Sequence, residues 1–143
     1  MANLFEAAKQ QIGELTLAAY AAAVKKGLLP DGAEMAGSVE IAREQSMGDW
    51  ATSCAMAAAK QLKTAPRKIA EVLVSELNLS GSFFESAEAA GPGFINFRLS
   101  DKWYAEVLSA IETEGDRFGC VDAGSGRIMV EFVSANPTGT MTI

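Results

Sequence analysis

The sequence predicts an α+β fold: a small antiparallel sheet with packed helices, followed by the first strand of a Rossmann-like domain. Apolar residues recur at helical spacing near the N-terminus, and two alternating segments flank a Gly-Pro-Gly turn. A third alternating segment, 127–134, follows a flexible linker over 121–126 and runs into Asn-Pro-Thr-Gly. Such a strand and loop are typical of the start of nucleotide-binding α/β domains. We therefore expect one domain over 1–123 and a truncated second one over 124–143.

The first half of the predicted domain begins with a long helix. Asn3 and Glu6 resemble a capping box, and the helical pattern that follows extends over 4–26. Its apolar stripe consists of Leu4, Ala8, Ile12, Leu15, Ala19 and Ala22. A loop is expected over 28–37 and a short, half-exposed strand over 38–43.

Two further helices are expected in the middle of the chain. Asp49 can cap the first, which would run from Trp50 to about Lys63, and Pro66 suits the first turn of the second. The apolar face of this second helix consists of Ile69, Val72, Leu73 and Leu77.

A hairpin and a last helix complete the predicted domain. The hairpin strands cover 83–89 and 94–99, with the Gly-Pro-Gly turn between them. The helix covers 101–114, with Ser100 as its cap and Gly115 as its end. The residues expected to face inward from it are Tyr104, Val107, Leu108 and Ile111.

The composition is that of a globular chain, with 49% hydrophobic and 21% charged residues among 143. No apolar stretch is long enough to cross a bilayer, and no secretory signal precedes the first helix. Two cysteines without any histidine leave Cys-His catalysis without a base and provide too few ligands for zinc. We therefore expect a cytoplasmic protein with no metal site and no membrane partner.

The formal net charge of −6 argues against strong non-specific binding to nucleic acids. Such binding draws its affinity from neutralising phosphates with lysine and arginine. DNA is therefore not expected as a partner, although a small local contact with RNA is compatible with an acidic body.

The second hairpin strand has an unusual outward face. Alternation sends Ile95, Phe97 and Leu99 to a core face, while Phe94, Asn96 and Arg98 lie on the other. An aromatic ring, a carboxamide and a guanidinium suit an unstacked base and its phosphate. The alternative is an ordinary strand whose Phe94 packs under a loop, and the local pattern favours that simpler interpretation.

The final segment also carries polar groups at a place where a ligand could bind. Glu131 lies near the end of the predicted strand, and Ser134 and Asn136 follow where the strand would open into a crevice. A carboxylate with these two residues suits a cationic ligand with several donors. A local turn before Pro137, which needs no ligand, is equally compatible with the pattern.

Three motifs in order resemble the arginyl-tRNA synthetase family, class I aminoacyl-tRNA synthetases. VEFVSANPTG at 130–139 resembles the segment that enters the family's ATP-binding signature. GDWAT at 48–52 and GPGFINF at 91–97 resemble its additional N-terminal domain. The resemblance implies that this domain grips the elbow of tRNA(Arg), with Phe94 and Asn96 contacting a base of the D-loop.

The resemblance also implies roles for the final segment, as part of an enzyme that activates arginine with ATP and esterifies it to tRNA(Arg). Mg²⁺ is expected to accompany ATP there. The matching arginine-binding positions are Glu131, Ser134 and Asn136. The positions that lead into the ATP signature are Pro137, Thr138 and Gly139.

The sequence departs from the family pattern at Thr142, which stands where the first histidine of the ATP signature is usual. The rest of the catalytic domain is missing, so no catalytic residue is assigned and the chain by itself is expected to be inactive. The alternative is a free-standing RNA-binding or regulatory module derived from the synthetase, and a purely structural interaction domain is a third hypothesis.

Overall fold

The computed structural model describes residues 4–120, 124, 126–127 and 129–131. In chain order the first half contains α1 (Leu4–Lys25), β1 (Val39–Ile41), β2 (Trp50–Thr52) and α2 (Cys54–Leu62). The second half contains α3 (Pro66–Glu76), β3 (Phe84–Ala90), β4 (Phe94–Leu99) and α4 (Asp101–Glu114). Short 3₁₀ turns cover Gln45–Met47 and Gly115–Arg117. The described residues therefore form an α+β domain, as predicted.

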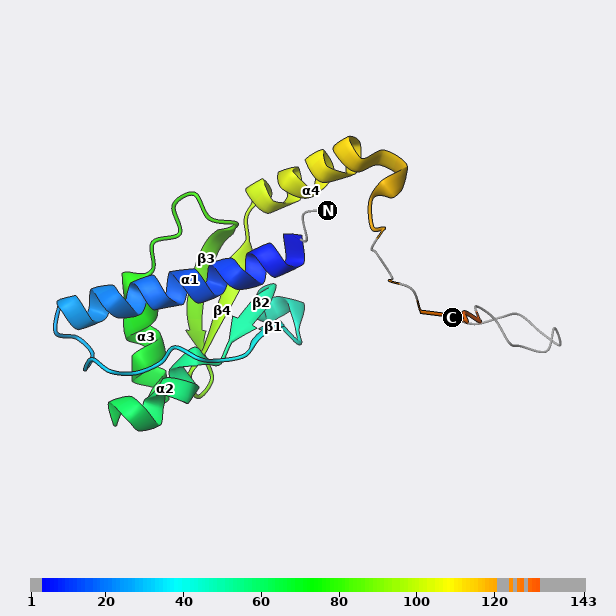
Figure 1. The fold of residues 1–143 in the computed structure, drawn as a ribbon. Coiled ribbons are helices and arrows are strands. Elements are labelled where there is room, and N and C mark those ends of the chain that lie inside the picture. Colours follow the sequence, from blue (N-terminus) through cyan, green and yellow to red (C-terminus); the bar gives the residue numbers. More distant parts are fainter. Residues whose placement is uncertain (1–3, 121–123, 125, 128, 132–143) are drawn as a thin grey trace.

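The four strands form one antiparallel sheet in the order β1-β2-β4-β3, so that β4 pairs on both sides. Helix α1 crosses the sheet, and helices α2 and α3 lie at one end of the sheet (Figure 1). The core fills the space between these helices and one sheet face. Its largest fully buried apolar side chains are Phe97, Ile12, Ile69, Leu73 and Ile95.

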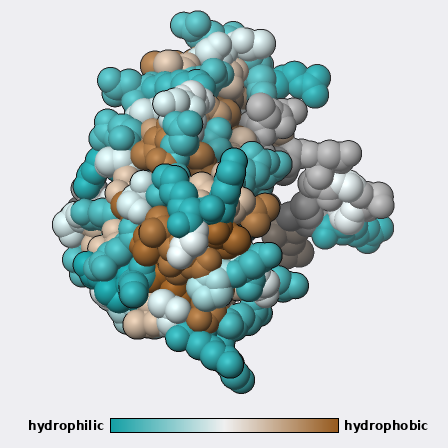
Figure 2. Space-filling view, turned by 90° about the vertical axis from the view of Figure 1, so that its left-hand side faces the viewer, coloured by the Kyte–Doolittle hydropathy of each residue, from teal (hydrophilic) through white to brown (hydrophobic). Residues whose placement is uncertain are grey.

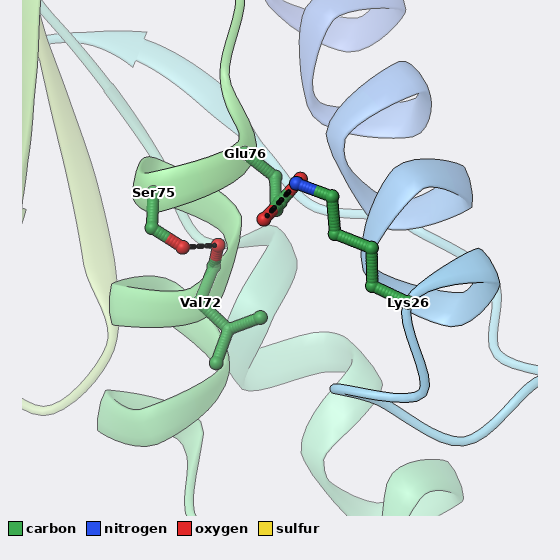
Figure 3. A network of polar contacts seen from close by, with 4 residues as sticks. All are labelled: Lys26, Val72, Ser75 and Glu76. Carbon is green, nitrogen blue, oxygen red and sulfur yellow. Dashed lines mark hydrogen bonds and ion pairs between the residues drawn. The ribbon is translucent and has the colours of Figure 1, made fainter.

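An ion pair connects the C-terminal ends of helices α1 and α3. Lys26, one residue beyond α1, donates to Glu76 Oε1 at 2.9 Å, and its ammonium lies 2.7 Å from Oε2 (Figure 3). On the preceding turn of α3, Ser75 Oγ donates to the Val72 carbonyl oxygen at 2.7 Å.

On the side of the molecule that lies left in Figure 1, hydrophobic surface gathers in the middle and hydrophilic groups surround it (Figure 2).

Most of the predicted elements are confirmed. The helix expected over 4–26 is α1, the hairpin is β3–β4, and the helix opened by Pro66 is α3. The short strand expected over 38–43 is β1, which is limited to three residues. No helix in the described part of the chain is both long and apolar enough to cross a membrane.

The prediction of a helix from Trp50 to Lys63 is wrong in its first part. Trp50–Thr52 form strand β2 and pair with β1 on one side and β4 on the other. Asp49 does not cap a helix: its carboxylate accepts the Leu99 N–H at 2.8 Å, and its own N–H donates to the Phe97 carbonyl at 2.9 Å. Three residues are too few to show alternation, so only the sheet itself reveals this strand.

The prediction for α4 is right in its bounds and wrong in its orientation. No residue of α4 is buried, and Tyr104, Leu108 and Ile111 are exposed. The Ser100 hydroxyl donates to the Phe83 carbonyl and makes no cap bond with the helix. Helix α4 extends away from the rest of the domain after its first turn (Figure 1), so its apolar face lacks the expected cover.

The predicted strand over 127–134 is not seen where the chain is described. Arg127 and residues 129–131 have no regular secondary structure, and the rest of that segment lies outside the described residues. The Rossmann-like strand and the division at 123 and 124 therefore stay predictions.

We predict that Asp49→Ala destabilises the domain by about 1–3 kcal/mol. The half-buried carboxylate accepts the Leu99 N–H, and a buried donor left without its acceptor carries a cost of this order. Urea unfolding of the purified chain measures the free energy of unfolding. Glu106→Ala, at an exposed position on α4, is the control and should change it by less than about 0.5 kcal/mol. Equal stability of the two variants would contradict the role of Asp49.

Candidate nucleic-acid interface

The face of the sheet that points away from the core is hollowed along β4. Side chains on this face alternate with the core residues of the strand, so Phe94, Asn96 and Arg98 share it. The strand register sets their neighbours, because residues paired across strands point the same way. Asn96 pairs with Ala51 on one side and Glu88 on the other.

Two adjoining hollows form one groove on this face. The larger has a volume of 630 Å³, is lined by residues of all four strands and the loop after β1, and includes Phe94. The smaller, of 180 Å³, includes Arg98. Met47, Glu88 and Asn96 line both hollows, so Asn96 lies where they meet. We refer to both together as the sheet groove.

The hairpin turn holds Phe94 at one end of the sheet groove. Gly93 has φ +144°, and a Cβ on it would lie 2.8 Å from Pro66 Cβ, so the turn sits directly on the start of α3. Arg67 of α3 donates to the Gly91 carbonyl at 3.1 Å. Phe94 is 38% exposed as a residue, so it is partly covered by the protein and partly open to a ligand.

Asn96 lies deeper than the sequence suggests. Its side chain is on the predicted face, but it is only 5% exposed because Ala51 and Glu88 flank it on the neighbouring strands. Within the described part of the chain, its carboxamide makes no hydrogen bond to another side chain or to the backbone. A carboxamide in the floor of a groove with its donors and acceptor unused can bind a ligand that carries complementary groups.

The charges around the sheet groove are mixed. Glu40 and Glu88 lie in the same row as Asn96, and Arg43 and Arg98 line the two hollows. All four of these side chains are exposed, and none of them forms an ion pair within the described ranges. The sheet groove is therefore close to neutral, unlike a surface built to bind phosphates alone.

From the sequence, strand β4 of this site was identified, but the residues on the neighbouring strands and loop that line the sheet groove were missed. The loop after β1, with Arg43 and Met47, carries no local pattern that links it to β4. Glu88 could have been found, because the hairpin register pairs it with Asn96. The other predicted site lies elsewhere: Glu131 is exposed and lies beyond α4.

The remaining predicted arginine- and ATP-site residues, Ser134, Asn136, Pro137, Thr138 and Gly139, lie outside the described residues. Their roles stay predictions. Of the predicted site residues, the described structure therefore brings together Phe94 and Asn96 alone.

The fold and the sheet groove define the class of protein: a small α+β domain with helices on one sheet face and a partly polar groove on the other. Comparison with known families is more specific. The model of the arginyl tRNA synthetase N terminal domain matches residues 6–99. The chain belongs to this family.

Relatives of known sequence agree with that assignment, and a solved structure shares the fold. The arginine–tRNA ligase of Acetivibrio thermocellus is 43% identical over 142 residues, and that of Caldanaerobacter subterraneus subsp. tengcongensis is 46% identical over the same length. Each match covers 99% of this chain and 25% of the relative, so the chain spans about a quarter of their length. The structure of arginyl-tRNA synthetase from Plasmodium falciparum shares the fold, with a TM-score of 0.53 and 19% identity over 70% of this chain and 17% of that one.

We predict that Asn96→Ala lowers the free energy of unfolding by less than about 1 kcal/mol, because the change removes packing of a buried side chain but no intramolecular hydrogen bond. Asn78→Ala is the matched control, since the Asn78 Oδ1 accepts the Ser80 N–H at 3.1 Å. The control should lose about 0.5–1.5 kcal/mol, although Asn78 is far more exposed. Urea unfolding decides: a larger loss at Asn96 than at Asn78 would mean that the Asn96 amide supports the fold.

Proposed function

We propose that this chain is the tRNA-contacting N-terminal part of an arginine–tRNA ligase, and that the sheet groove receives a base from the elbow of tRNA(Arg). The family match and the ligase relatives support the first half of this statement. The single observation that carries the second half is the partly open Phe94 ring beside an unused carboxamide at Asn96.

The two side chains offer complementary interactions to one unstacked base. An aromatic ring stacks on the face of any base, and a carboxamide can donate to and accept from a base edge. Because they are two positions apart on one strand, their Cα atoms are separated by about 7 Å. Bases in loops of folded RNA are accessible in this way, whereas bases in an A-form duplex are not. A D-loop base at the tRNA elbow meets this requirement.

The near-neutral sheet groove implies that stacking and hydrogen bonding supply most of the binding free energy. Glu40 and Glu88 would repel a phosphate placed between them, and the whole chain carries a net charge of −6. Binding through this site should therefore weaken little as the salt concentration rises, in contrast to binding through many phosphate contacts.

The contribution of this domain to the reaction is positioning. The parent enzyme would activate arginine with ATP, in the presence of Mg²⁺, and transfer the arginyl group to the 3′ end of tRNA(Arg). Glu131, Ser134 and Asn136 would bind arginine, and Pro137, Thr138 and Gly139 would lead into the ATP site. Holding the tRNA elbow would favour productive placement of the acceptor end in that distant site, which lowers the entropic part of the barrier.

We expect Phe94→Ala to lower the affinity of the full-length enzyme for tRNA(Arg) about 10-fold or more, because one base–ring stack is worth about 1–3 kcal/mol. Phe94→Tyr keeps a ring and should retain most of the affinity. Leu17→Ala removes an exposed apolar side chain from α1 and serves as the control with no expected effect. Equilibrium binding of labelled tRNA(Arg) is the measurement. Affinity unchanged by Phe94→Ala would exclude the sheet groove as the tRNA site.

A further inference from the structure

Helix α4 presents an apolar face with no cover in the described structure. Tyr104, Leu108 and Ile111 follow the spacing of one helical face and are 49%, 62% and 40% exposed. The adjacent side of the helix, with Val107 and Ala110, is half-buried. An isolated exposed leucine is common on protein surfaces, whereas these three side chains form one continuous apolar patch on one side of a helix.

The first turn of α4 provides its attachment to the domain. Lys102 Nζ donates to the Gly81 carbonyl and lies over the Phe83 ring, and Trp103 packs edge-on against Phe5. Trp103 Nε1 is buried and has no acceptor among the residues that the structure describes. A buried indole N–H normally finds a partner, so the surroundings of α4 are incomplete at this point as well.

The position of α4 in the chain indicates what completes it. The family domain matches residues 6–99 and ends with β4, whereas α4 starts at Asp101. The ligase relatives nevertheless match over 99% of this chain and are about four times as long. Helix α4 therefore lies beyond the N-terminal domain proper, in the region that joins it to the rest of the relatives.

Charge and area argue against other occupants. Helix α4 carries four carboxylates and one lysine, which disfavours RNA and anionic membranes as partners. Three half-exposed side chains offer on the order of 300 Å² of surface. That is well below the roughly 800 Å² per partner of a stable complex between separate molecules. A domain in the same chain needs less, because the connection gives a high effective concentration.

We propose that the face formed by Tyr104, Leu108 and Ile111 packs against the body of the parent ligase that follows this region in the chain. This rests on the proposed function only in requiring the longer parent, not in requiring that the sheet groove bind tRNA. Packed in this way, α4 would act as a rigid strut between the domain and the catalytic body. It would set the direction in which the sheet groove faces relative to the active site.

Thiol labelling tests the proposal directly. Leu108→Cys is made in a Cys120→Ser background, in both the 143-residue chain and the full-length enzyme, and alkylation by N-ethylmaleimide is followed at the peptide level. Cys54 is a silent internal reference, because burial removes it from solvent and raises the pKa of its thiol. Ser109→Cys is the matched control, since Ser109 is exposed and is turned by about 100° from Leu108 around the axis of α4.

We expect the thiol at position 108 to react at least 10-fold more slowly in the full-length enzyme than in the 143-residue chain, while the thiol at 109 reacts at similar rates in both. Leu108→Glu provides a second readout: it should lower the melting temperature of the full-length enzyme and leave that of the short chain nearly unchanged.

Two results would overturn the proposal. Equal rates at position 108 in both proteins would show that the rest of the full-length enzyme does not cover the face. Protection in the short chain that increases with its concentration would assign the face to a second copy. Neither readout involves tRNA, so a failure here is distinct from a failure of the Phe94→Ala binding experiment.

Discussion

The pairing of β4 on both sides is the constraint on which the rest of the structure depends. Between β2 and β3, this strand directs Ile95 and Phe97 into the core and Phe94 and Asn96 to the open face. The first pair is fully buried, so the second pair cannot turn inward without destroying the core. The energy that fixes the candidate site therefore comes from residues that never touch a ligand.

One face of the sheet forms the core and the other forms the candidate site, and this difference explains which features of the site could be predicted from the sequence. Alternation within one strand is a local signal, so the outward position of Phe94 and Asn96 was predictable. The burial of Asn96 was not, because it depends on Ala51 in β2, a strand too short to have a pattern of its own. The wall formed by the loop at Met47 depends on the same pairing and was missed for the same reason.

Helix α4 shows the opposite limit of sequence reasoning. Its apolar periodicity correctly predicts the helix and its bounds, but the residues expected to face inward are not buried in the structure. Periodicity cannot say whether that cover comes from the same domain. Tyr104 and Leu108 are exposed, and they lie on a helix that begins after residue 99, where the family match ends. An apolar helical face has the same sequence pattern whether or not its own domain covers it, and only the coordinates distinguish the two cases.

The most direct test of the central claim is an amide NMR titration of the isotopically labelled 143-residue chain with a tRNA(Arg) transcript. If the open face of the sheet is the contact surface, chemical shifts change at Phe94, Asn96 and their neighbours Ala51 and Met47. The outer side of α1, at Leu17, stays unchanged. Shift changes confined to the helices, with the amides along the sheet groove unaffected at saturating RNA, would contradict the account.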